Sequence, residues 1–346
     1  MTIFTQNSAT AIADLLPVNP DEPVFVLTDT VTQQLCLPAL QTNARLQQAK
    51  IISIPNGDDN KTLNTLTEVW GFLSENGATR HSLIINLGGG MVTDLGGFAA
   101  ATFKRGIDCI NIPTTLLGAI DASSGGKTGI NFLGLKNEIG AFHAPKAVVI
   151  DINFFRTLDT QNLLSGFAEM IKHALLDNST LLGETLAFDV EHIDYNRLET
   201  LVRKNLDIKE RIVAEDPHER GLRKALNLGH TIGHAIETLS HKTGEPLLHG
   251  YAVMWGLLCE LYLSHLQHQF PTSTLNTILY FAKEHYGTFP FTCKHYDALF
   301  ELMKHDKKNE AQTINFTLLA DTGDIRIDQT ATKEQIFEAL DFVREN

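Results

Sequence analysis

The sequence predicts an α/β domain with a mostly parallel sheet, followed by a mainly α-helical domain. In the first half, short apolar runs alternate with stretches of helical periodicity, an order typical of parallel sheets. After about residue 155, helical periodicity dominates and strand-like runs are scarce. With 346 residues, the chain is long enough for two domains that each have a full core. We therefore expect the first domain at residues 1–158 and the second at residues 159–346.

Apolar runs bounded by turn residues predict the strands of the first domain. The expected strands are 24–28, 50–55, 82–87, 107–112 and 147–152, with a helix over 61–73. In the second domain, helical periodicity predicts helices at 163–176, 198–215, 224–239, 251–266 and 275–284. The segment 313–319 is the one strand expected there.

Composition excludes several classes of protein. Hydrophobic residues make up 43% and charged residues 20%, which is typical of a globular protein. The net charge of -13 argues against nucleic acid or an anionic membrane surface as a partner. No apolar run approaches the roughly 20 residues that span a bilayer. The four cysteines lie far apart and no signal peptide begins the sequence, so we expect reduced thiols in a cytoplasmic protein.

A glycine-rich segment, residues 88–97, follows the third expected strand. Glycines at a strand-to-helix turn let backbone approach a phosphate, and helix N-termini favour anions. The spacing differs from the GxGxxG fingerprint, so the generic dinucleotide motif is absent. Asp94 is placed to bind a ribose hydroxyl or a cofactor amide. The alternative is a plain tight turn.

Residues 103–137 combine cations with glycines and small polar residues. Lys127 follows two glycines and precedes a threonine, but Asp121 stands where the phosphate loop of nucleotide triphosphatases needs glycine. We therefore do not expect a nucleotide triphosphatase. Lys127, Lys136 and Asn137 suit a single phosphate or a carboxylate. The alternative is a solvated surface loop.

Residues 223–237 are the most informative stretch of the second domain. Placed on one helix, they form an apolar face of Leu228, Ile232, Ala235, Ile236 and, just beyond, Leu239. A polar row on another face contains Arg223, Asn227, His230 and His234. Gly229 and Gly233 disfavour a helix interior, which suggests close packing there. Histidines four apart suit a metal, with either or both as ligands; the alternative is a pair of hydrogen-bonded core histidines.

Other polar groups of the second domain add to this picture. Glu169 and Lys172 are three apart on one expected helix, with His173 adjacent. Glu169 with the histidine row suggests a Glu/His/His divalent site, for which His249 is the candidate third ligand. The alternatives are an ordinary salt bridge for Glu169 and Lys172, and solvated side chains for Lys209 and Lys307.

These strings, in order, resemble the 3-dehydroquinate synthase family over about residues 58–308. The matching segments are GGGMVTDLGGFAA, PTTLL, DASSGGKTGIN, KNEIGAF, AEMIK, VAEDPHERGLR and LNLGHTIGHAIE. The resemblance implies a Rossmann-like NAD-binding first domain and a helical metal- and substrate-binding second domain. It departs from the usual motif at Asp58, where Glu is usual, at Phe132, where His is common, and at Tyr251, where Glu is usual. The segment between His234 and His249 is also slightly longer than usual.

The resemblance also implies a role for each matched residue. The metal ligands, for zinc or cobalt, would be Glu169, His230 and His249. The NAD contacts would be Asp29, Asp58, Lys61, Gly89, Gly90, Asp94, Thr114 and Thr115. The catalytic set would be Asp121, Lys172, Lys209, Asn227 and His234, and the substrate-binding set Arg105, Lys127, Lys136, Asn137, Arg223 and Lys307.

The implied reaction converts 3-deoxy-D-arabino-heptulosonate 7-phosphate, a phosphorylated sugar acid, to 3-dehydroquinate and phosphate in the shikimate pathway. It needs a transient oxidation by NAD, which the same cofactor reverses. The resemblance also implies a homodimer in which Arg105 reaches the neighbouring active site. Two alternatives stay open at this point: a related sugar-phosphate cyclase with another product, and a metal-dependent NAD polyol dehydrogenase.

Overall fold

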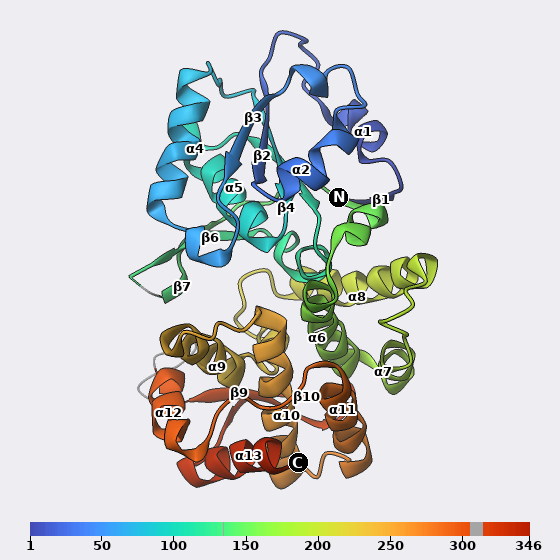
Figure 1. Ribbon diagram of the computed structural model, residues 1–346, viewed down its shortest axis with the longest axis vertical. Coiled ribbons are helices and arrows are strands. Elements are labelled where there is room, and N and C mark those ends of the chain that lie inside the picture. The colour runs from blue at the N-terminus through green and yellow to red at the C-terminus, as the bar shows by residue number, and fades with distance from the viewer. Residues whose placement is uncertain (134, 305–313) are drawn as a thin grey trace. The chain divides into compact units, whose positions relative to one another are not determined.

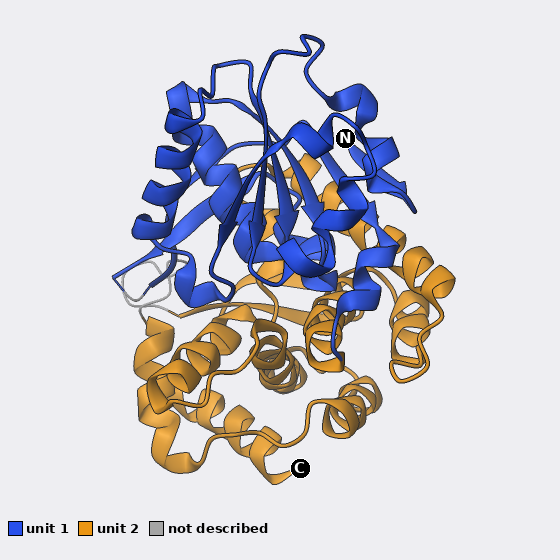
Figure 2. Cartoon of the chain, turned by 45° about the horizontal axis from the view of Figure 1, so that its top comes forward, with its two compact units in different colours: residues 1–159 blue, residues 160–346 orange. Residues whose placement is uncertain are grey.

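The computed structural model describes residues 1–133, 135–304 and 314–346, and the chain divides into two compact units. Figure 2 colours unit 1, residues 1–159, and unit 2, residues 160–346. An α/β unit with a parallel sheet precedes a largely helical unit, so the expected fold class is confirmed. That unit 1 binds NAD and that unit 2 binds metal and substrate stay predictions.

Unit 1 contains a six-stranded sheet in which every pairing is parallel. Its order is β1-β8-β5-β4-β2-β3. Figure 1 labels β1, β2, β3 and β4 of this sheet. The strands are β1 (Thr2–Thr5), β2 (Val24–Asp29), β3 (Lys50–Ile54), β4 (Leu83–Gly88), β5 (Asp108–Pro113) and β8 (Ala147–Asp151). All but β1 were expected. Strands β2, β4 and β8 are buried along their whole length, as continuous apolar runs predict.

Helices cover both faces of this sheet. Helices α4 (Leu63–Glu75) and α5 (Gly90–Thr102) pack on one face, where Leu66 and Leu95 join a core with Phe25 and Ile84. The short helices α1 (Ser8–Ala11), α2 (Thr32–Leu35) and α3 (Leu37–Leu40) flank the other face. Short helical turns lie at Ala13–Leu15, Leu46–Gln48, Asp58–Asn60, Phe103–Arg105, Gly118–Ala122 and Ile152–Thr157. Both faces of the sheet are thus buried, and the polar loops lie at the ends of its strands.

Part of the glycine-rich cationic segment, for which a surface loop was one interpretation, forms a two-stranded antiparallel hairpin. It pairs β6 (Lys127–Phe132) with β7 (Leu135–Phe142). Gly129 is paired with Gly140, and a Cβ on Gly140 would lie 2.1 Å from the Thr128 carbonyl oxygen. The glycines therefore allow the strands to approach closely. Because glycine is uncommon in strands, the sequence pattern did not predict these two strands.

Unit 2 is built around α10 (His249–His268), which packs against α6, α9, α11, α13 and β9. The other helices are α6 (Thr160–Asp177), α7 (Ser179–Leu186), α8 (Tyr195–Glu215), α9 (His230–Thr243), α11 (Thr272–His285), α12 (Tyr296–Lys304) and α13 (Lys333–Glu345). Helical turns lie at Leu222–Asn227 and Cys293–His295. An antiparallel pair is formed by β9 (Asn315–Asp321), close to the expected strand, and β10 (Asp324–Thr330).

The expected single helix over 224–239 is wrong. Residues Leu222–Asn227 form a 3-10 turn, and the chain then bends at Gly229, whose φ is +78°. Helix α9 begins only at His230, so Arg223 and Asn227 do not share a helical row with His230 and His234. Only glycine adopts this left-handed backbone readily.

Close packing at the two glycines is confirmed. A Cβ on Gly229 would lie 2.6 Å from Cγ of Leu257 on α10. A Cβ on Gly233 would lie 3.1 Å from the Ala252 carbonyl oxygen, also on α10. The two helices α9 and α10 therefore approach each other more closely than larger side chains would allow.

None of the helices in the described parts of the chain has both the length and the apolar character that crossing a bilayer requires. The four cysteines are free thiols; Cys36, Cys109 and Cys259 are buried, and Cys293 is exposed.

Candidate functional site

Three side chains of unit 2 meet at one point. Glu169 lies in the middle of α6, and His230 and His249 are the first residues of α9 and α10. Oε1 of Glu169 lies 3.3 Å from Nε2 of His230 and 3.4 Å from Nε2 of His249. One ligand atom from each residue falls within 4.8 Å of the others. One carboxylate oxygen and two imidazole nitrogens form a donor set that suits zinc or a similar divalent ion.

The second ring nitrogen of each histidine is already engaged. Nδ1 of His230 lies 3.1 Å from the Leu228 carbonyl oxygen, and Nδ1 of His249 lies 3.1 Å from Oε2 of Glu237. In the neutral form of each ring, a hydrogen bond donated by Nδ1 leaves the free lone pair on Nε2. Both rings are therefore oriented as metal-binding histidines are.

Lys172 lies one turn after Glu169 on α6 and forms an ion pair with its Oε2. Both side chains are almost fully buried. Oε2 thus faces a cation, whereas Oε1 faces the two imidazoles. The salt bridge expected as the ordinary explanation exists, but only one of the two carboxylate oxygens takes part in it.

Burial and neighbouring charge shift the pKa of each group in this cluster. Burial alone would raise the pKa of Glu169, but Lys172 and His230 hold it well below its usual range. Burial lowers the pKa of His230 to about 4, although Glu169 opposes the shift. Burial would also lower the pKa of His249, but Glu237 and Glu169 outweigh it and raise that pKa to about 10. At neutral pH, His230 is therefore a neutral imidazole, and a cation that binds His249 must displace a proton.

The second histidine of the expected polar row stands beside this cluster. The His234 ring centroid lies 5.3 Å from that of His230 and 6.0 Å from that of His249. His234 is half-buried, and it belongs to neither of the groups of three possible ligands found among the described residues. The geometry therefore separates His230 from His234, which the spacing alone could not do.

The remaining unit 2 candidates lie on other elements. Lys209 is buried on α8. Arg223 is buried, and its Nη1 donates to the Pro217 carbonyl oxygen at 2.7 Å. Nδ2 of Asn227 donates to Oε1 of Glu219 at 2.8 Å. Lys307 lies outside the described residues.

The sequence did not predict the roles of two buried glutamates, Glu237 and Glu260. Glu237 contacts His249, as described above. Glu260 of α10 accepts hydrogen bonds from the backbone N–H of Gly229 at 2.6 Å and of Ile232 at 3.2 Å, and so caps the start of α9. One signal was available for Glu237, because it lies seven residues after His230 and thus on the same face of α9. No pattern pointed to Glu260.

In unit 1, the expected cofactor contacts gather at the carboxyl ends of parallel strands. Asp29 ends β2, and its Oδ1 accepts from the N–H groups of Val31 and Thr32 at 2.8 Å. Gly89 and Gly90 follow β4 and begin α5. Thr114 and Thr115 follow β5, and the Thr114 N–H donates to the Gly88 carbonyl oxygen. The carboxyl edge of an open parallel sheet is where such folds bind ligands.

A charged network centred on the buried Lys61 joins the same edge to the β6–β7 hairpin. Lys61 is 3% exposed and donates to Asp94 of α5 and to Asn137 of β7. Lys136 pairs with Asp58 at 3.2 Å. Burial raises the pKa of Asp94, although Lys61 opposes this shift. Burial would also raise the pKa of Asp58, but Lys136 and Lys61 outweigh it and lower that pKa. The expected cofactor residues Asp58 and Lys61 thus contact two expected substrate residues.

Replacing Lys61 by methionine is expected to lower the free energy of unfolding by about 3 kcal/mol, because the largely buried Asp94 carboxylate would lose its cation. Urea unfolding measures this loss. Adding Asp94→Asn to the methionine variant removes the unpaired charge and should recover part of the stability. Equal stability of Lys61→Met and the unmodified chain would show that this ion pair stabilises nothing.

The other unit 1 candidates lie on other loops and strands. Arg105 is exposed, and its φ of +69° follows a φ of +50° at Lys104. Such backbone is unusual outside glycine and is found at functional sites. Asp121 lies in the turn Gly118–Ala122, and Lys127 is exposed at the start of β6. Their roles stay predictions.

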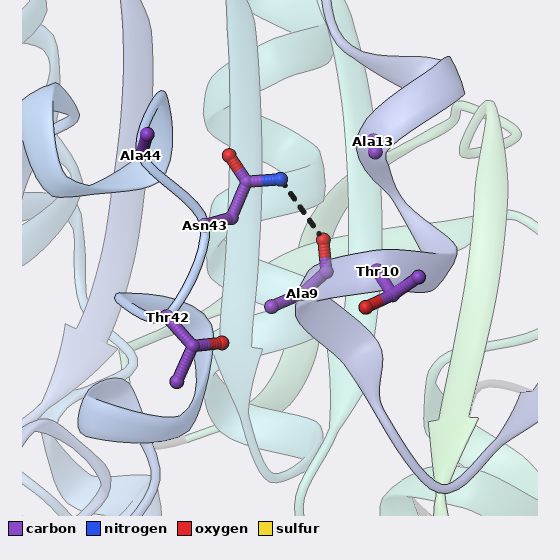
Figure 3. A pocket seen from close by; sticks show the side chains of 6 residues that line it. All are labelled: Ala9, Thr10, Ala13, Thr42, Asn43 and Ala44. Atoms are coloured by element: carbon purple, nitrogen blue, oxygen red, sulfur yellow. Dashed lines mark hydrogen bonds between the residues drawn. The ribbon is translucent and has the colours of Figure 1, made fainter.

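A small surface pocket in unit 1 offers no comparable chemistry. Figure 3 shows the hydrogen bond that Nδ2 of Asn43 donates there to the Ala9 carbonyl oxygen, at 3.1 Å. The pocket is lined by Ala9, Thr10, Ala13, Thr42, Asn43 and Ala44. None of these side chains titrates near neutral pH, so the pocket is not a candidate for catalysis.

Solved structures define the class to which this fold belongs. A 2-deoxy-scyllo-inosose synthase complexed with carbaglucose-6-phosphate, NAD+ and Co2+ superposes with a TM-score of 0.87 at 24% identity, covering 100% of this chain and 96% of that one. A 2-epi-5-epi-valiolone synthase from Streptomyces hygroscopicus with NAD+ and Zn2+ bound gives 0.86 at 25% identity, with the same coverage. The fold is that of the sugar-phosphate cyclases.

Sequence comparison identifies the family. Residues 51–165 match the model of the 3-dehydroquinate synthase N-terminal domain, and residues 166–309 match that of the C-terminal domain. The 3-dehydroquinate synthase of Parabacteroides distasonis is 51% identical over 344 residues, which covers 99% of this chain and 98% of that protein. This chain belongs to the 3-dehydroquinate synthase family, whose enzymes act in the shikimate pathway. The expected resemblance is confirmed.

Proposed function

We propose that this chain carries out the 3-dehydroquinate synthase reaction with one divalent cation, zinc or cobalt, held by Glu169, His230 and His249, and with NAD at the carboxyl edge of the unit 1 sheet. One observation carries the metal assignment: Oε1 of Glu169 lies 3.3 and 3.4 Å from two Nε2 atoms whose rings are oriented through Nδ1.

The residues fit a cation in two further respects. In the described part of the chain, neither oxygen of the Glu169 carboxylate accepts a hydrogen bond of good geometry. A buried carboxylate in this state favours a bound cation in addition to Lys172. Three protein ligands also leave a coordination position for substrate oxygens, which is the arrangement of catalytic rather than structural zinc sites.

The NAD assignment rests on the edge that Asp29, Gly89, Gly90, Thr114 and Thr115 form. The glycine turn brings backbone N–H groups and the start of α5 to that edge, which favours a pyrophosphate. Asp29 and Asp94 supply carboxylates that suit ribose hydroxyls. The structural neighbours described with NAD+ and with Co2+ or Zn2+ support both cofactors.

The substrate of the family is a phosphorylated sugar acid, 3-deoxy-D-arabino-heptulosonate 7-phosphate. When bound, NAD supplies a reversible hydride acceptor, and the divalent ion supplies Lewis-acid polarisation of hydroxyl oxygens. The chain's own groups do the rest. His234, half-buried beside the cluster, is the proposed group for proton transfer. Lys172 and Lys209 are proposed to stabilise negative charge on substrate oxygens, and Arg223 to orient the phosphate.

We also propose the remaining catalytic and substrate-binding roles that the family resemblance implies. Asn227 and Asp121 complete the catalytic set, and Arg105, Lys127, Lys136, Asn137 and Lys307 the substrate-binding set. A cytoplasmic location and a homodimer to which Arg105 contributes across the interface are likewise proposed. No nucleic-acid or membrane partner is expected for a chain with this net charge.

The decisive assay supplies the heptulosonate phosphate with catalytic NAD and zinc, and measures phosphate and cyclic product together. We expect equal amounts of phosphate and 3-dehydroquinate, with no accumulation of NADH because the hydride returns to the substrate. A polyol dehydrogenase would instead accumulate NADH with glycerol as substrate. A cyclase for another sugar would leave the heptulosonate phosphate intact. Either outcome contradicts the proposal.

A further inference from the structure

We propose that Glu237 is a positioning residue that holds His249 in its metal-binding orientation and strengthens its bond to the ion. Glu237 is 2% exposed on α9, and its Oε2 lies 3.1 Å from Nδ1 of His249, the first residue of α10. This inference rests on the proposed metal site.

The two histidines are supported differently. His230 is oriented by a neutral backbone carbonyl, that of Leu228. His249 is oriented by a buried carboxylate on a neighbouring helix. A carboxylate at Nδ1 makes the opposite ring nitrogen more basic than a carbonyl does, and outer partners of this kind commonly change metal affinity about 10- to 100-fold.

The negative charge of Glu237 also affects the electrostatic surroundings of His249. Both histidines stand at helix N-termini, where the positive end of the macrodipole disfavours a cation. Lys172 adds a positive charge next to Glu169. Glu169 offsets that lysine and Glu260 caps the start of α9, while Glu237 places a negative charge directly beside His249.

His249 also depends on Glu237 for its place. The side chain of His249 is 26% exposed, and the segment before it, residues 244–248, has no helical or strand structure. The Glu237 carboxylate therefore ties the exposed start of α10 to the buried face of α9. Without it, the His249 ring is free to rotate away from Glu169.

The test measures cobalt binding by the full-length chain through competition with a chelator, together with the visible absorption of bound Co2+. Glu237→Gln keeps an acceptor for Nδ1 and removes the charge; we expect cobalt to bind about 10-fold more weakly. Glu237→Ala removes both, and we expect a loss of up to about 100-fold and an altered cobalt spectrum. Should the alanine variant fail to fold, the nearly isosteric glutamine variant decides.

Asp151→Asn is the matched control. Asp151 is a buried carboxylate of unit 1 that accepts hydrogen bonds from Ser8 and Asn153 and belongs to neither proposed site. It should lose stability without any change in cobalt affinity. If both Glu237 variants bind cobalt as tightly as the unmodified chain and lose only stability, the inference is wrong. If the unmodified chain binds cobalt no better than His230→Ala, the proposed metal site itself fails.

Discussion

Replacing His230 by alanine is expected to release the bound zinc and to lower turnover roughly a thousand-fold, which corresponds to about 4 kcal/mol of transition-state stabilisation. The reason is geometric: Nε2 of His230 lies 3.3 Å from Oε1 of Glu169, and its ring is fixed through Nδ1. Zinc content of the purified chain and steady-state phosphate release measure the two effects.

His234→Ala is the informative partner of that variant. His234 lies one helical turn further along α9, beside the cluster but outside the three-atom set. We expect zinc to be retained and turnover to fall about 100-fold, as the loss of a proton-transfer group commonly does. Equal loss of zinc in the two variants would show that the division between ligand and proton-transfer group is wrong.

Gly250→Ala is expected to destabilise unit 2 by about 3 kcal/mol, at the upper end of the overpacking range, and to weaken metal binding as well. A Cβ at residue 250 would lie 1.9 Å from the Ser165 carbonyl oxygen and 2.5 Å from its Cα. These are backbone atoms of α6, so a rotamer change cannot relieve the contact. Helices α6 and α10 must separate, which draws His249 away from Glu169. Urea unfolding and cobalt titration measure the two losses.

Gly183→Ala provides the matched control for that substitution. Gly183 lies inside α7, and a Cβ there would meet no atom within 4 Å. Alanine favours the helix by about 1 kcal/mol over glycine, so this variant should gain a little stability and keep its metal affinity. Similar behaviour of the two variants would refute the role assigned to the close contact between α6 and α10.

Much of the fold was predictable because its strands are buried on both faces. Such strands, β2 and β4 among them, appear as continuous apolar runs between turn residues. The strand β1 was missed because its four residues are only half-buried at the edge of the sheet. The hairpin was missed because its pairing depends on Gly129 and Gly140, residues that favour loops in pattern analysis.

The candidate site was predictable to a different extent. Spacing placed two histidines four apart on α9, but only the fold distinguishes His230 from His234 by its distance to Glu169. The break before His230 depends on a left-handed Gly229 packed against Leu257, and a periodic pattern contains neither fact. Glu237 and Glu260 act through contacts between helices, so their roles become visible only when the helices are packed together.

Anomalous X-ray diffraction at the zinc edge, from crystals of the full chain grown with zinc, tests the central claim most directly. We predict one strong peak about 2.0–2.2 Å from Oε1 of Glu169 and from Nε2 of His230 and of His249. A peak that has His234 as a ligand in place of His249, or that lies away from Glu169, would contradict it.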